Sequence, residues 1–138
     1  MFYARMPSDN AATVAAGAPV QFPQTFAGNQ NGVLRATASD FILVEAGTYE
    51  VSWQVSVTEP GQLEVWTGPT IAQSGLAYTV VGRATGTSQI VGHTLVSALA
   101  GTFLSIRNPA GNSPALTITP SAGGTHAVSA NLLIKRIA

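Results

Sequence analysis

The sequence predicts an all-β domain of about ten short antiparallel strands, folded as a sandwich, barrel or jelly roll, and three observations support this prediction. Apolar and polar residues alternate over 48–58, which is typical of a half-buried strand. Gly, Pro and Asn interrupt the rest of the chain at strand-length intervals. No segment carries the 3.6-residue period of an amphipathic helix.

The predicted strands follow one another closely along the chain. Residues 11–18 are rich in alanine, but Gly17 and Pro19 would break a helix there, so we expect an irregular lead-in. The apolar run 40–44 is separated from the alternating strand only by residues 45–47, which predicts a hairpin. The other predicted strands are 20–22, 63–66, 78–81, 88–99, 102–107, 115–119 and 128–137.

The composition indicates one domain, residues 1–138, and limits its partners. A chain of 138 residues is long enough to form a single core. Charged residues make up only 9% and the formal net charge is zero, so we expect no nucleic acid partner. A soluble monomer normally carries more surface charge than a chain with 46% apolar residues and 9% charged residues, so we expect this chain to self-associate. No apolar run reaches the ~18 residues of a membrane span, so we expect no membrane insertion.

The predicted strand 88–99 is apolar on both sides. Ile90 and Val96 lie on one side of it, and Val91, Leu95 and Leu99 lie on the other. A strand of a two-layered sandwich has only one side on the core, so its second apolar side needs another partner. A contact with another subunit would provide that partner.

The last predicted strand shows the same pattern, because Leu133 and Ile137 lie opposite Val128, Leu132 and Ile134. The two tryptophans differ. Trp53 shares its side of strand 48–58 with apolar residues and is predicted to be in the core, whereas Trp66 shares its side with polar residues. The predicted subunit interface therefore consists of Trp66, Val91, Leu95, Leu99, Leu133 and Ile137.

The sequence contains no recognisable catalytic or metal-binding pattern. Neither His93 nor His126 has a second histidine or a carboxylate at metal-ligand spacing, and the acidic residues do not cluster as in a calcium loop. There is no cysteine and no Gly-x-Ser-x-Gly elbow, and residues 82–86 lack the Lys-Ser/Thr ending of a phosphate-binding loop. We therefore expect no enzyme activity, no cofactor and no bound metal.

Three segments of the sequence resemble those of a known superfamily. The apolar run 40–44, followed by Gly47-Thr48-Tyr49 and the alternating strand, resembles the tumour-necrosis-factor-like and complement-globular-head jelly rolls. Residues 127–138 look like their final strand, and Phe2-Tyr3-Ala4 like their first strand. Within that superfamily, the pattern most resembles the C-terminal domain of Bacillus-type collagen-like exosporium glycoproteins.

This resemblance implies a jelly-roll β-sandwich that assembles as a homotrimer. It also implies that the domain is a structural and adhesive cap at the tip of a collagen-like stalk, on an extracellular or spore surface (exosporium). The first expected partner is then a second copy of the same chain. The sequence contains no Gly-X-Y tract. The stalk therefore either lies upstream of this sequence or is lacking, as in a stalkless relative.

A second function remains open from the residues alone. An exposed indole is a usual platform for a sugar ring, so a carbohydrate-binding, lectin-like module with Trp66 and the polar loops as its site is the alternative. A host-receptor-binding adhesin is a related possibility, so a surface glycan or a host receptor is the second expected partner.

Overall fold

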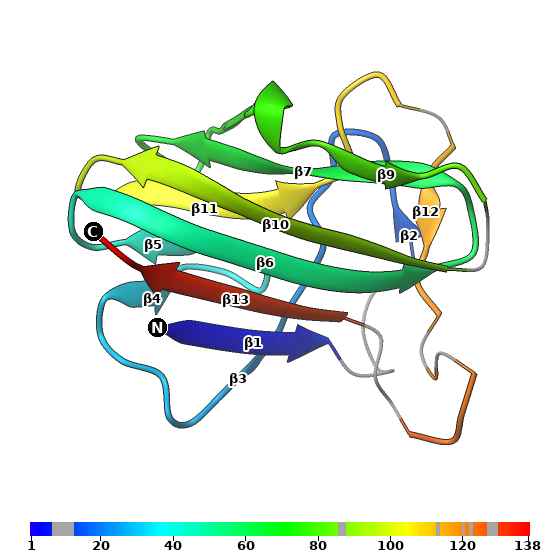
Figure 1. The fold of residues 1–138 in the computed structure, drawn as a ribbon, viewed down its shortest axis with the longest axis horizontal. Helices are drawn as coiled ribbons and strands as arrows, with labels where there is room; N and C mark the ends of the chain where they lie inside the picture. Colours follow the sequence, from blue (N-terminus) through cyan, green and yellow to red (C-terminus); the bar gives the residue numbers. More distant parts are fainter. Residues whose placement is uncertain (7–12, 86–87, 113, 120, 122, 127–129) are drawn as a thin grey trace.

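The fold is a sandwich of two antiparallel sheets, seen in a computed structural model that describes residues 1–6, 13–85, 88–112, 114–119, 121, 123–126 and 130–138. The sheet nearer the viewer in Figure 1 is called the front sheet here. In order, it consists of β10 (Ser88–Ala98), β6 (Gly47–Val57), β13 (Ala130–Arg136), β1 (Phe2–Met6) and β3 (Gln24–Thr25).

The sheet behind it is called the back sheet. In order, it consists of β4 (Val33–Arg35), β5 (Phe41–Leu43), β11 (Thr102–Arg107), β7 (Gly61–Gly68) and β8 (Ser74–Gly75), and β9 (Val81–Arg83) also pairs with β7. A short ribbon of β2 (Thr13–Val14) and β12 (Leu116–Thr117) lies at one end of the sandwich, and a 3₁₀ helix, η1, spans Ala77–Thr79. The all-β jelly-roll prediction is confirmed.

The core lies between the two sheets and follows from the alternation of side chains along the strands. In β6, Tyr49, Val51, Trp53 and Val55 are buried, while the residues between them are only half-buried. The central strands of the back sheet contribute the facing layer: Phe41, Leu43, Leu63, Val65, Leu104 and Ile106. The prediction that Trp53 belongs to the core is confirmed.

The predicted hairpin between residues 40–44 and 48–58 is wrong. β5 pairs with β4 and β11 in the back sheet, whereas β6 pairs with β10 and β13 in the front sheet. The chain crosses from one sheet to the other at this point, and the Tyr49 hydroxyl donates a hydrogen bond to the Glu45 carbonyl at 2.7 Å across the corner. A short connection between two apolar strands permits either a hairpin within one sheet or a crossing between two sheets. Here, crossing lets both strands bury their apolar sides in one core.

Two other predicted strands also differ from the structure. At 78–81 the chain forms η1 first, because the buried Thr79 hydroxyl donates to the Leu76 carbonyl and accepts from the Val65 amide. The predicted strand 20–22 is an irregular segment, although Val20 and Phe22 are buried and their amides donate to the Ile106 and Ala38 carbonyls. The final strand begins at Ala130, and Val128 lies outside the described residues.

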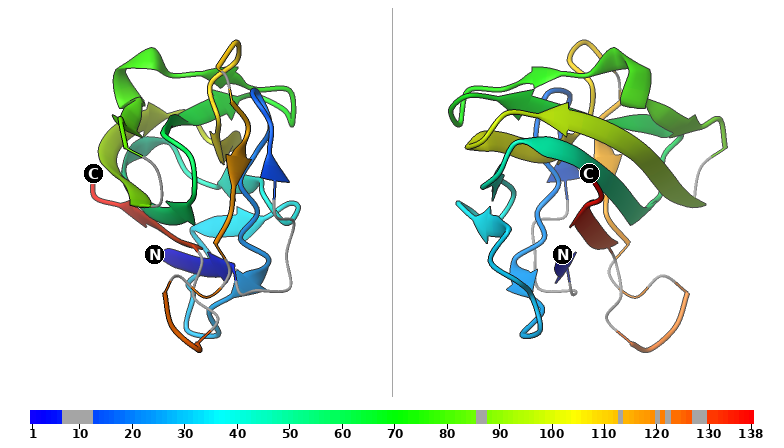
Figure 2. Two further views of the ribbon diagram at one scale, coloured as in Figure 1. Left: turned by 90° about the vertical axis from the view of Figure 1, so that its right-hand side faces the viewer. Right: turned by 60° about the vertical axis from the view of Figure 1, so that its left-hand side comes forward.

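Both chain ends lie at the same end of the front sheet. Phe2 pairs with Ile134, which places the start of β1 beside the end of β13. The side views in Figure 2 also show the two termini close together on the front-sheet side of the molecule. Among the described residues, no helix is long and apolar enough to cross a bilayer.

Candidate functional site

The outward side of the front sheet is the side that faces the viewer in Figure 1, and it carries exposed apolar residues. In β10, Ile90 and Val96 point into the core, so the residues that alternate with that side, Val91, His93 and Leu95, point outward. Val91 is 58% exposed and Leu95 is 51% exposed. Leu99, just beyond the end of β10, is 79% exposed. The opposite-side assignment is confirmed for Val91 and Leu95, and three large apolar side chains are exposed along β10 and just beyond its end.

Tyr78 extends this apolar surface from outside the sheet. It lies in η1, is 67% exposed, and its hydroxyl donates a hydrogen bond to the Leu95 carbonyl at 2.9 Å. The sequence analysis missed it because an isolated tyrosine in a turn has no periodic neighbours that would assign it to a face. We call the residues Tyr78, Val91, Leu95 and Leu99 the edge patch.

A polar stripe follows the edge patch across the sheet. It consists of Glu50, Ser52 and Gln54, which alternate with the buried residues of β6. Gln54 pairs with Val91 and Glu50 with Leu95 in the register. His93 lies in the same region, with its Nε2 3.5 Å from Glu50 Oε1. The outward side of the front sheet is therefore not uniformly apolar.

Beyond the stripe, β13 and β1 form a second apolar area. Leu133 is half-buried and pairs with Tyr3, whose ring meets the ring of Phe26 edge-on at 6.2 Å between centroids. Phe26 is 50% exposed. Asn29 fixes this loop on β1, since its side chain accepts from the Tyr3 amide at 2.7 Å and donates to the Tyr3 carbonyl at 3.0 Å. We call Tyr3, Phe26 and Leu133 the hollow patch.

The hollow patch takes its name from an open depression of about 600 Å³ beside it, within the typical size range of ligand pockets. It is lined by Tyr3, Arg5, Gln24, Thr25, Phe26 and Ala27. The Arg5 guanidinium donates to Gln24 Oε1 at 3.3 Å on one wall. Ile137, which follows β13, is exposed at the end of the sheet near the termini. The structure thus places Val91, Leu95 and Leu133 on the outward side of the front sheet, whereas Leu99 and Ile137 are exposed just beyond the ends of β10 and β13.

Trp66, by contrast, lies on the other sheet. It belongs to β7, pairs with Ser105 and is half-buried. The Arg107 guanidinium covers its ring at 5.0 Å from the centroid, and its Nε1 donates to Glu64 Oε1 at 2.8 Å. Because one face of the ring and the indole N–H already have partners within the chain, Trp66 is not a free platform for a sugar ring. Because β7 belongs to the back sheet, Trp66 is also not a neighbour of the predicted interface residues on the front sheet.

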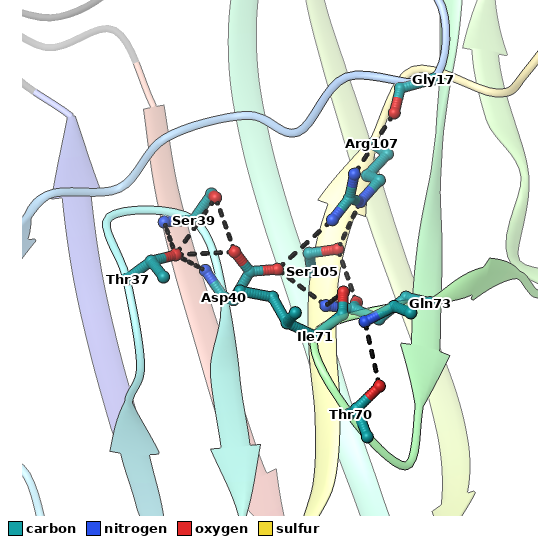
Figure 3. Close-up of polar contacts among 10 residues, drawn as sticks. Gly17, Thr37, Ser39, Asp40, Thr70, Ile71, Gln73, Ser105 and Arg107 are labelled. Atoms are coloured by element: carbon teal, nitrogen blue, oxygen red, sulfur yellow. Dashed lines mark hydrogen bonds and ion pairs between the residues drawn. The ribbon is translucent and has the colours of Figure 1, made fainter.

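Arg107, which covers the Trp66 ring, also belongs to a buried polar network around Asp40 (Figure 3). The Asp40 carboxylate accepts four hydrogen bonds. Oδ1 accepts from Gln73 Nε2 at 2.7 Å and from Arg107 Nη2 at 3.4 Å. Oδ2 accepts from Thr37 Oγ1 at 2.6 Å and from Ser39 Oγ at 3.0 Å. Since the chain itself satisfies this carboxylate, the network is a structural link between loops.

The histidines do not contribute to a metal site in the part of the chain that the structure describes. His93 has one acidic neighbour, and His126 is exposed in a loop. No group of three or more His, Asp or Glu side chains within the described ranges is close enough to hold a metal ion. The candidate site is the outward side of the front sheet.

Comparisons with solved structures identify the fold. The globular domain of zebrafish complement 1qA protein is 14% identical and superimposes with a TM-score of 0.68, covering 99% of this chain and 96% of that chain. Murine APRIL at pH 5.0 is 15% identical with a TM-score of 0.64, covering 97% and 98%. Eiger TNF from S. frugiperda is 14% identical with a TM-score of 0.63, covering 99% and 93%.

The chain therefore has the jelly-roll fold of TNF-like and complement globular domains. At these identities the likeness concerns the fold alone. Comparison with family models and with curated proteins finds no match.

Proposed function

We propose that this protein is a non-catalytic globular head that assembles as a homotrimer through the outward side of its front sheet. The observation that carries the proposal is the exposure there of Val91 and Leu95, with exposed Leu99 and Tyr78 next to them along the β10 edge. Surface patches of this kind mark interaction sites, and burying them in a subunit contact removes apolar area from water. The low charge of the whole chain supports the same assembly.

We further propose that the trimer caps a collagen-like stalk on an extracellular or spore surface, as the sequence resemblance implies. The position of the N-terminus fits this role, because β1 begins at one end of the front sheet, beside the end of β13. Three copies joined through their front sheets would bring three N-termini to one end of the assembly. A triple helix requires such a meeting of three chains.

The mass of the purified chain tests the trimer. Light scattering at low micromolar concentration should give three times the mass of one chain, and a monomer at that concentration would overturn the proposal. The cap is tested separately by fusing a short Gly-Pro-Pro repeat to Met1. The wild-type head should raise the melting temperature of the triple helix, measured by circular dichroism, whereas the Leu95→Asp head should not. Equal melting temperatures would rule out the cap while leaving the trimer intact.

A further inference from the structure

The two apolar patches of the front sheet are separate surfaces with different shapes. The edge patch lies along β10 and projects highly exposed side chains, including Leu95 and Leu99. The hollow patch lies along β13, β1 and the loop after β3, where Phe26 and Tyr3 border a depression of about 600 Å³ within the size range of ligand sites. Between the two patches runs β6, whose outward residues include Glu50, the register partner of Lys135.

The symmetry of an assembly decides which surfaces meet. In a two-fold dimer a patch meets its own copy, so one patch is sufficient. In a closed ring of three, each contact joins two different surfaces of neighbouring copies, so every chain needs a pair of complementary patches. A projecting patch and a depression on opposite halves of the same sheet are such a pair.

We propose that the edge patch of one copy docks into the hollow patch of the next, so that Leu95 and its neighbours fill the depression beside Phe26. This inference rests on the proposed trimer and states which surfaces form its contact. It adds Tyr3, Phe26 and Tyr78 to the interface. The depression is open in the single chain and is completed only by the neighbouring copy.

Charge and rigidity favour this occupant. Arg5 lines the depression, and Glu50 lies next to Leu95 in the sheet register, so docking brings opposite charges into one contact. Phe26 is held in place before docking by its edge-on contact with Tyr3 and by the two hydrogen bonds between the Asn29 side chain and the Tyr3 backbone. A preformed wall loses less conformational freedom on binding than a mobile one.

The chain contains no cysteine, so single cysteines can report the contact without background. The variants Phe26→Cys and Leu95→Cys are made separately, one with a mass tag, and mixed so that subunits exchange. A short bis-maleimide linker is then added, and the linked peptides are identified by mass spectrometry. We expect links between position 26 and position 95, at least tenfold more abundant than links joining two identical positions. A Leu34→Cys variant, exposed on the back sheet, serves as the control and should not link to Phe26→Cys.

The outcomes separate the two proposals. If light scattering gives a trimer but links join position 95 to position 95 in preference to position 26, the docking of the edge patch into the hollow patch is wrong and the trimer stands. If the trimer forms and neither position links, the docking is also wrong. If the chain is a monomer, the proposed function itself fails.

Discussion

The indole of Trp53 lies directly over Gly92, its partner in the register between β6 and β10. A Cβ atom built on Gly92 would collide with three atoms of the indole ring. The glycine is therefore a packing requirement, since only a residue without a side chain leaves room for the largest side chain of the core. This contact also explains why an apolar strand carries a glycine on its core side.

Gly92→Ala should lower the free energy of unfolding by about 1–3 kcal/mol, because the added methyl group overpacks a filled core. Urea denaturation followed by tryptophan fluorescence measures the change. Gly32→Ala is the matched control, since a Cβ there would meet nothing within 4 Å. If both variants were equally stable, the indole would have to be free to move away from β10.

Asp40→Ala should destabilise the fold by about 3–5 kcal/mol, the usual effect of removing one partner of a buried ion pair. The substitution leaves Arg107 and Gln73 without their shared acceptor on the back sheet. Glu45→Ala is the control, because its pair with Arg136 is exposed and should contribute at most about 1 kcal/mol. Denaturation midpoints of the two variants would give the comparison, and similar losses would contradict a buried network.

Glu59 gives the fold a small dependence on pH. The Thr117 hydroxyl donates to its carboxylate at 2.7 Å, and this bond lowers the pKa of Glu59 more than partial burial raises it. A depressed pKa means that the carboxylate stabilises the folded chain above the unfolded value of about 4.3. That contribution is lost as the pH falls from there through the folded pKa.

Glu59→Gln should remove this part of the pH dependence. Because Glu59 is largely exposed, the effect should stay under about 1 kcal/mol. Melting temperatures of the variant and the wild type, measured from pH 6 to pH 2, should differ most at the neutral end and converge in acid. A constant difference over that range would show that the bond to Thr117 does not depend on ionisation.

Trp66→Ala should cost some stability, since the ring packs against Arg107, but it should leave the mass of the assembly unchanged. The sequence favoured the opposite outcome, an intact fold with weaker assembly. That expectation was based on the position of Trp66 on the polar side of a predicted strand. The sequence pattern does not show that this strand belongs to the back sheet. Thermal melting and light scattering of the same sample separate the two outcomes.

The alternation along single strands was sufficient to predict which residues face inward, as in β6 and β10. It was not sufficient to predict which strands pair. Residues 40–44 and 48–58 have the pattern of a hairpin, and their separation into two sheets depends on pairing with β11 and β10, which lie far along the chain. The pattern of apolar residues within a segment does not identify partner strands that lie far away in the sequence.

The candidate surface was predictable where it is built from strands and not elsewhere. Val91, Leu95 and Leu133 follow from a period of two, and the structure places all three on the outward side of one sheet. Tyr78 and Phe26 lie in a 3₁₀ turn and a loop, where no period assigns a side. Tyr78 joins the surface because its hydroxyl donates to the Leu95 carbonyl, and Phe26 joins it because its ring packs against the Tyr3 ring.

Leu133 provides the most direct test of the front sheet as an interface. It is half-buried on β13, between Tyr3 and Ser52 in the register, and points away from the buried Leu132 and Ile134. An aspartate at this position adds a charge on the outward side and spares the core. In a subunit contact that charge would be buried without a partner, which is strongly unfavourable.

Leu133→Asp should therefore keep a β-type circular dichroism spectrum and lose the trimer in light scattering at low micromolar concentration. Leu34→Asp places the same charge on a leucine of β4 that is exposed on the back sheet, and it should remain trimeric. If Leu133→Asp did not fold alone, Leu133→Ser would test the same side with a milder change and should weaken the trimer at least tenfold in its dissociation constant. A stable trimer of Leu133→Asp would mean that this side of β13 meets water, and the subunit contact would then have to join β10 to another surface of the neighbouring copy.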